Sequence, residues 1–302
     1  MRPLRSLVIF IAVVFLGGAL LAPWLYWLAD AFAHTFPSLA QKPFHRYVNR
    51  SMLGLALIGL WPFLRSLGIK SAADVGLVRP AGQWRKLGGG FLLGFGSLAC
   101  VAVLALVAGA RKFNHAFAGA DWTVKLLGIV LTAGAVGVLE EILFRGALFG
   151  ALRKMWNWAV ALVVSSMVYA IVHFLARTQD PATVSWTSGF GQLGLMLAGF
   201  TDWRQIVPGF FNLTLAGMLL ALAYQRTGNL YFSIGLHAGW IFWLKSYGWL
   251  TAEVAGAGVW FWGTRKLIDG WLALPLLAIV LAISLRVFRR AETKSRYDGI
   301  CF

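Results

Sequence analysis

Long apolar stretches alternate with short polar ones along this chain. Eight stretches are long enough to cross a bilayer as helices, since about 20 apolar residues span its hydrocarbon core. They are residues 5–28, 50–68, 87–110, 124–152, 157–177, 205–226, 230–249 and 268–288, separated by charged and Gly/Pro clusters. The pattern predicts an all-α fold, a polytopic integral membrane bundle of about eight transmembrane helices, with residues 1–302 as a single domain.

The composition supports a membrane protein. Of the 302 residues, 59% are hydrophobic and 13% are charged, whereas soluble proteins have about 25% charged residues. The net charge of +16 would suit a nucleic-acid-binding protein, but the basic residues are spread over short loops and tails between the apolar stretches. That spread is typical of contacts with lipid headgroups. We therefore expect a lipid bilayer as partner and no nucleic acid.

The two ends of the chain predict its orientation. The first apolar run continues to about Leu28 without a clear small-residue cleavage site, which favours a retained first helix over a signal peptide. Residues 289–302 form a basic tail, and Lys and Arg are modestly enriched on the side of the N-terminus. We expect both termini in the cytoplasm, with the bacterial inner membrane as the location.

The connection 178–204 is long and carries several apolar side chains. We expect it to lie on or dip into the outer interface as an amphipathic segment. A lid over an active site is the alternative.

Two carboxylates and a guanidinium interrupt the fourth apolar stretch. They belong to Glu140, Glu141 and Arg145. A charged side chain at mid-bilayer costs roughly 2.5–3.5 kcal/mol, so these groups must be paired, hydrated or used. Glu141 and Arg145 are four residues apart and share a helix face, which favours a structural ion pair. Glu140 is rotated by about 100° and is left as the reactive carboxylate.

Two histidines in later stretches are candidate partners of Glu140. His173 lies in the next predicted span, and His237 lies in the seventh beside small residues that allow close helix approach. One Glu with two His at membrane depth can hold a water, a proton or a metal. Tyr169, one turn before His173, would orient that ring or simply pack. Asn212 of the sixth span would bond between helices or line the site.

The order and spacing of these residues resemble the CAAX protease and bacteriocin-processing family of intramembrane endopeptidases. Its motifs, Glu-Glu-x-x-x-Arg, aromatic-x-x-x-His and His-x-x-x-Asn, read here as Glu140-Glu141…Arg145, Tyr169…His173 and His237…Ile241. The resemblance covers about residues 124–245, and the peptidase core would be about 124–249. Two positions depart from the pattern, because Tyr169 replaces the usual Phe and Ile241 replaces the usual Asn.

The resemblance implies an eight-helix bundle that cuts a membrane-associated protein or peptide. Glu140 with His173 would activate a water, and His237 would polarise the scissile carbonyl or stabilise the oxyanion. Glu141 and Arg145 would fix the pocket and tune Glu140. We expect a metal-free glutamic peptidase without a cofactor; a zinc ion held by Glu140, His173 and His237 is the alternative.

Ile241 leaves the function open in two ways. If the usual Asn stabilises the oxyanion, another donor must replace it, and Asn212 is a candidate. The alternative function is a non-catalytic membrane partner, or immunity-like protein, that keeps the charged cluster for packing. A proton-coupled transporter is a third hypothesis, but the sequence lacks paired broken helices in two matching halves.

Overall fold

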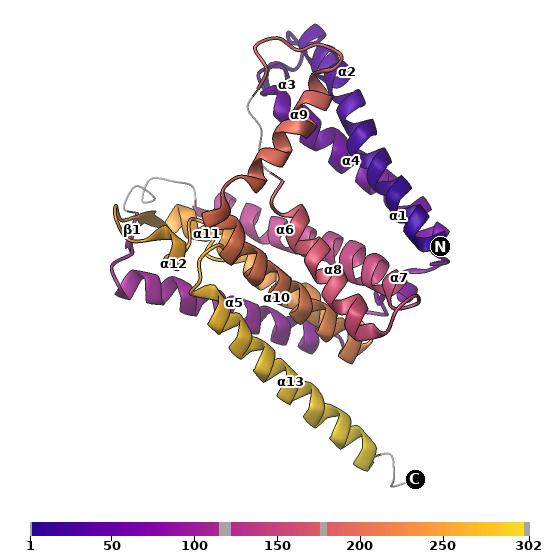
Figure 1. The fold of residues 1–302 in the computed structure, drawn as a ribbon, viewed down its shortest axis with the longest axis vertical. Helices are drawn as coiled ribbons and strands as arrows, with labels where there is room; N and C mark the ends of the chain where they lie inside the picture. The colour runs from indigo at the N-terminus through magenta and orange to yellow at the C-terminus, as the bar shows by residue number, and fades with distance from the viewer. Residues whose placement is uncertain (1, 115–121, 176–179, 299–302) are drawn as a thin grey trace. The chain divides into compact units, whose positions relative to one another are not determined.

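The computed structural model describes residues 2–114, 122–175 and 180–298 (Figure 1). It is 75% helix and 2% strand, which confirms the expected helical fold. The chain divides into two compact units. Unit 1 comprises Met1–Lys70 and Val172–Trp203, and unit 2 comprises Ser71–Ile171 and Arg204–Phe302. The prediction of a single domain stays a prediction.

Unit 1 contains helices packed through small residues. They are α1 (Arg2–Ala12), the π-helix η1 (Val13–Gly17), α2 (Gly18–Ala31), α3 (Pro37–Ala40), α4 (Phe44–Ser66), α9 (Ser188–Met196) and the 3-10 helix η5 (Leu197–Phe200). A Cβ on Gly18 would lie 2.6 Å from Met52 Cγ of α4, and one on Gly189 would fall on the Ala19 carbonyl oxygen. The connection expected at the outer interface therefore contains a helix, α9, that packs on α2. Its interfacial or lid role stays a prediction.

Unit 2 holds the remaining elements. They are η2 (Ala72–Val75), α5 (Trp84–Val107), β1 (Arg111–Phe113), α6 (Trp122–Glu141), the π-helix η4 (Ile142–Phe149), α7 (Gly150–Leu152), α8 (Trp158–Val172), α10 (Trp203–Thr227), α11 (Tyr231–Leu250), β2 (Thr251–Glu253), α12 (Val259–Trp262) and α13 (Ala273–Asp298). All eight apolar stretches predicted from the sequence overlap helices of the structure.

Four described helical stretches are long and apolar enough to cross a membrane. They are Pro3–Ala31, Trp84–Val107, Trp122–Leu152 and Ile206–Thr227. Two further apolar helices, Trp158–Val172 and Ala273–Phe288, are shorter; the first has 15 residues, fewer than the about 20 that span the hydrocarbon core. The chain is an integral membrane protein, and the expected number of about eight spans is not confirmed.

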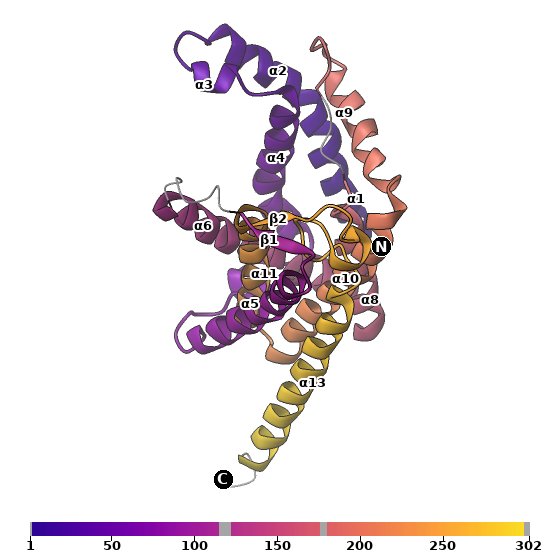
Figure 2. The same cartoon turned by 90° about the vertical axis from the view of Figure 1, so that its left-hand side faces the viewer.

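Four glycines bring α5 and α11 into close contact, and the two helices lie side by side in Figures 1 and 2. These glycines are Gly90, Gly94, Gly235 and Gly239. A Cβ on Gly94 would fall on the Leu236 carbonyl oxygen, and one on Gly239 would lie 2.6 Å from the Phe91 carbonyl oxygen. Because His237 lies between the two glycines of α11, this small-residue packing holds its backbone against α5.

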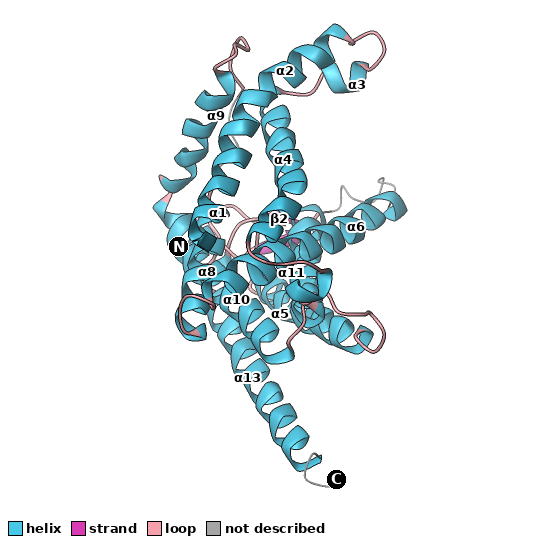
Figure 3. Ribbon diagram, turned by 90° about the vertical axis from the view of Figure 1, so that its right-hand side faces the viewer, coloured by secondary structure: helices cyan, strands magenta, loops and turns pink. Residues whose placement is uncertain are grey.

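A two-stranded sheet was not predicted. β1 and β2 pair antiparallel, with Arg111 opposite Glu253. Figure 2 labels both strands, and Figure 3 labels β2 among the helices. Each strand has three residues and lies beyond the end of a long helix, so it leaves no alternating pattern.

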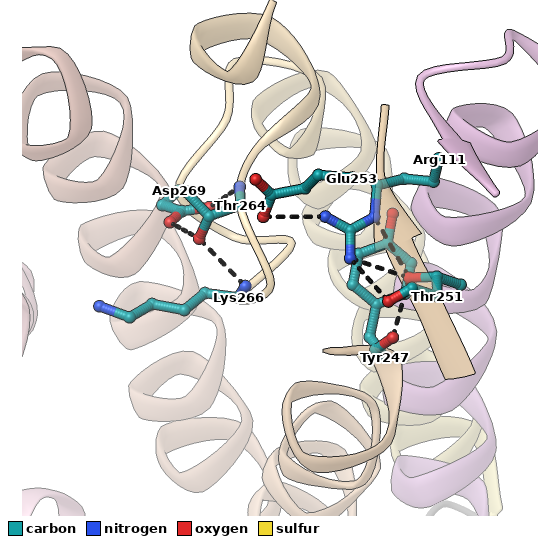
Figure 4. Close-up of polar contacts among 7 residues, drawn as sticks. All are labelled: Arg111, Tyr247, Thr251, Glu253, Thr264, Lys266 and Asp269. Atoms are coloured by element: carbon teal, nitrogen blue, oxygen red, sulfur yellow. Dashed lines mark hydrogen bonds and ion pairs between the residues drawn. The ribbon is translucent and has the colours of Figure 1, made fainter. Parts of the chain in front are cut away.

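Polar contacts secure the strand pair (Figure 4). Arg111 Nη1 lies 3.0 Å from Glu253 Oε1, and its Nε and Nη2 donate to Thr251 Oγ1 at 3.2 and 3.0 Å. The guanidinium carbon lies 4.7 Å from the ring centroid of Tyr247. Arg111 is buried, so these contacts compensate a charge that has lost its water.

Candidate active site

The first sequence motif lies where an α-helix changes into a π-helix. α6 ends at Glu141, and η4 carries Arg145. The sequence predicted one continuous α-helix, whereas π-helical hydrogen bonds run from residue i to i+5, and such segments are frequent at functional sites. A Cβ on Gly146 would lie 2.8 Å from Val75 Cβ, so this glycine allows η4 to pack closely on η2.

Glu141 joins the first motif to the last. Arg145 Nη1 donates to Glu141 Oε1 at 2.8 Å, which confirms the predicted ion pair. His237 Nδ1 lies 2.9 Å from the same oxygen. Glu141 is 0% exposed and Arg145 is 2% exposed. Because an ionised carboxylate only accepts hydrogen bonds, Nδ1–H donates to it and Nε2 points to the other side of the ring.

Glu140 and Tyr169 meet that other side of the imidazole. His237 Nε2 lies 3.7 Å from Glu140 Oε2 and 3.3 Å from the Tyr169 hydroxyl. The Glu140 side chain is 28% exposed, in contrast to the fully buried Glu141. A carboxyl oxygen and a phenol hydroxyl therefore both lie near the same imidazole nitrogen.

Tyr169 also contacts the guanidinium of the first motif. The Arg145 Cζ atom lies 4.5 Å from the Tyr169 ring centroid, and Phe144 packs edge-on against that ring at 5.0 Å between centroids. Arg145 Nη2 donates to the Gly217 carbonyl oxygen at 3.5 Å. A Cβ on Gly217 would lie 2.9 Å from Ser166 Cβ, so α10 approaches α8 closely beside the site.

Residues 121–243 match the model of a known family. The family is Rce1-like, type II CAAX prenyl endopeptidase Rce1-like. This match confirms the resemblance given by the motifs, and the cluster of charged and aromatic residues lies within it. Comparison with the curated proteins and with the solved structures found no match. The Rce1-like match, together with the membrane-length helices, supports an endopeptidase embedded in a lipid bilayer.

Two further residues were predicted for the site, and their outcomes differ. His173 is the first residue after α8 and belongs to unit 1, so its partnership with Glu140 stays a prediction. Asn212 of α10 donates from Nδ2 to the carbonyl oxygens of Ile268 at 2.7 Å and Gly270 at 2.8 Å. Both amide hydrogens are thereby engaged, which favours a packing role over the role of oxyanion donor.

The cluster brings two carboxyl groups, one guanidinium and one imidazole together. Glu141 contacts both Arg145 and His237, and Glu140 lies on the other side of the imidazole. An uncompensated charge is costly in a low-dielectric interior, so the contact between Arg145 and Glu141 offsets part of the charge of the cluster. An imidazole beside a carboxyl group is an arrangement that general acid–base chemistry uses.

The residues predicted to hold a zinc ion are Glu140, His173 and His237. His237 Nε2 lies 3.7 Å from Glu140 Oε2, and His173 belongs to unit 1. Within residues 2–114, 122–175 and 180–298, no group of three or more His, Cys, Asp or Glu is placed to hold a metal ion. Zinc binding and the metal-free alternative both stay predictions.

Proposed function

We propose that this chain is an intramembrane endopeptidase that hydrolyses a peptide bond of a membrane-associated protein or peptide. The observation that carries the proposal is the 3.7 Å approach of His237 Nε2 to Glu140 Oε2 inside a helical bundle of membrane-spanning length. The Rce1-like match supports this class of reaction. By its description, the family also makes a prenylated CAAX tail one substrate class to test.

In the proposed reaction, Glu140 assisted by His173 takes a proton from a water molecule. The water oxygen forms a bond to the carbonyl carbon, and the electron pair of the C=O double bond moves to the oxygen. A protonated His237 donates from Nε2 to that oxyanion. The intermediate then collapses with cleavage of the C–N bond, and Glu140 returns the proton to the leaving amine.

Glu141 and Arg145 act as positioning residues in this proposal. Glu141 holds Nδ1 of His237, which orients the ring and stabilises the imidazolium form. Arg145 offsets one of the two carboxylate charges through its 2.8 Å contact with Glu141. The pair therefore serves His237 as well as packing, which extends the structural role predicted from sequence.

The alternative is a non-catalytic membrane partner of the same fold. Its support is Ile241, a buried apolar side chain in the place where the motif has a hydrogen-bonding Asn. Under this hypothesis the charged cluster serves packing alone, and removal of the Glu140 charge alters stability without altering any protein terminus in the membrane.

The two functions are separated by comparing membrane-proteome termini between cells expressing wild type and Glu140→Gln at equal levels. Glu253→Gln is the matched control, because it removes a half-exposed carboxylate at the strand pair rather than in the cluster. The proposal predicts new termini with wild type and Glu253→Gln only. Identical termini in all three, with the proteins folded and abundant, would favour the non-catalytic partner.

A further inference from the structure

The proposed reaction needs hydrogen-bond donors at the oxyanion, and the last motif lacks one. Ile241 offers no donor, and the amide hydrogens of Asn212 are engaged by carbonyl oxygens. We propose that Tyr169 is a catalytic residue whose hydroxyl donates a hydrogen bond to the oxyanion and replaces the donor missing at position 241. This inference rests on the proposed peptidase function.

The positions of the three polar groups fit that role. The Tyr169 hydroxyl oxygen and His237 Nε2 are 3.3 Å apart. A single oxygen atom can therefore lie within about 2.7–3.1 Å of both, which is the distance at which donors stabilise an oxyanion. Glu140 Oε2 lies 3.7 Å from the same nitrogen, so the proposed base is also a neighbour of His237.

The surroundings of the phenol strengthen it as a donor. Tyr169 is 3% exposed, so bulk water competes little for its hydrogen bond. The Arg145 guanidinium lies over the Tyr169 ring, with its Cζ 4.5 Å from the ring centroid. Its positive charge favours the negative charge of an oxyanion that binds to the hydroxyl. Fixed donors in such a water-poor site act more strongly on a developing oxyanion than they would in water.

The two departures from the family motifs also complement each other. Phe to Tyr at 169 adds a donor, and Asn to Ile at 241 removes one. Ile241 lies four residues after His237 on α11, hence on the same helix face, and it is buried. Because Phe would keep the ring contacts with Arg145 and Phe144, the hydroxyl is the group that distinguishes Tyr169 from the usual residue.

The test uses purified full-length protein in liposomes and a reporter peptide spanning a cleavage site found in the terminus comparison. For Tyr169→Phe we expect kcat to fall by about 10²–10³-fold, with KM changed less than about twofold. Adding Ile241→Asn to Tyr169→Phe returns a donor near His237. That double variant is expected to recover at least about tenfold in kcat, because one donor accounts for about 10²–10³-fold.

A second measurement keeps the test decisive if Ile241→Asn impairs folding. The probe is a peptide aldehyde with the reporter sequence, whose tetrahedral adduct or hydrate mimics the intermediate. Its affinity should fall in Tyr169→Phe by about the same factor as kcat/KM, because a transition-state contact is lost. In a Glu140→Gln background, adding Tyr169→Phe should leave the affinity for the uncleaved peptide unchanged. The thermal midpoint should not change either.

Two results would overturn the inference. One is a Tyr169→Phe enzyme with wild-type kcat while Glu140→Gln is inactive. The other is a loss of kcat with unchanged aldehyde affinity, which would make Tyr169 a positioning residue for His237. An absence of any cleavage that depends on Glu140 would instead overturn the proposed function itself, so the two failures are distinguishable.

Discussion

Replacing Arg145 by Met would leave a carboxylate buried without its cation. Glu141 is 0% exposed, and its Oε2 atom has no hydrogen-bond partner among the described residues. In Arg145→Met, Oε1 would retain the contact with His237 Nδ1 alone. We therefore expect a large loss of folding stability from this single change, although Met fills much of the same volume.

The contact geometry sets the size of the effect. Two unit charges 2.8 Å apart, as in the Arg145 Nη1–Glu141 Oε1 pair, attract each other by about 6 kcal/mol at an effective dielectric constant of about 20. Desolvation offsets much of that attraction. Removing one partner of a buried ion pair nevertheless costs about 3–5 kcal/mol, whereas replacing both partners is often nearly neutral.

A double-mutant cycle measures this coupling. The free energy of unfolding would be determined for wild type, Arg145→Met, Glu141→Gln and the double variant, by Trp fluorescence in mixed micelles with increasing SDS. Each single variant should lose about 3–5 kcal/mol. The double variant should lose about 2–3 kcal/mol less than the sum of the two single variants.

Arg153→Met is the matched control for this cycle. Arg153 is exposed, with its Nη1 3.0 Å from Gln225 Oε1 and its Cζ 5.1 Å from the Tyr224 ring centroid. Because such exposed contacts contribute about 0.5–1 kcal/mol, its replacement should cost no more than about 1 kcal/mol. The reasoning would be refuted if Arg145→Met cost no more than Arg153→Met. It would also be refuted if the two single losses added without coupling.

Three further changes test other parts of the structure. Gly94→Val should separate α5 from α11, because a Cβ there falls on the Leu236 carbonyl oxygen. We expect a lowered thermal midpoint and a loss of peptide cleavage. A wild-type midpoint and a wild-type cleavage rate would contradict this packing. Arg111→Met should cost about 1–3 kcal/mol, measured by unfolding in SDS, because Thr251 loses its hydrogen bonds from a charged donor while the half-exposed Glu253 regains water. A loss below about 0.5 kcal/mol would contradict a stabilising role of these hydrogen bonds. Asn212→Ala should lower the free energy of unfolding by about 1–3 kcal/mol, because two carbonyl oxygens lose their donor, while kcat stays unchanged. A fall in kcat without a loss of stability would instead indicate that Asn212 is an oxyanion donor.

Helices were the part of the fold that the sequence could predict. A stretch of about 20 apolar residues has few stable alternatives in a bilayer, since its backbone groups must bond internally. The four-residue spacing likewise predicted the pairing of Glu141 with Arg145. The small residues around His237 predicted a close helix contact, and Gly235 and Gly239 make it with α5.

Long-range pairings and local deviations were not predictable in this way. Glu141 and His237 are separated by 96 positions, and no periodicity states which helix faces meet. The spacing related Tyr169 to His173 and gave no sign that its hydroxyl lies 3.3 Å from His237 Nε2. The π-helix that carries Arg145 leaves the hydrophobic pattern unchanged, so the sequence gives no sign of it.

The most direct test of the central claim follows the oxygen of the attacking water. Purified wild type and Glu140→Gln in liposomes would cleave the reporter peptide in H₂¹⁸O, and mass spectrometry would analyse the new C-terminal carboxylate. The account predicts one ¹⁸O in that carboxylate with wild type, and a rate lowered by about 10²–10⁴-fold in Glu140→Gln. Cleavage by Glu140→Gln at the wild-type rate, or a product without the label, would contradict it.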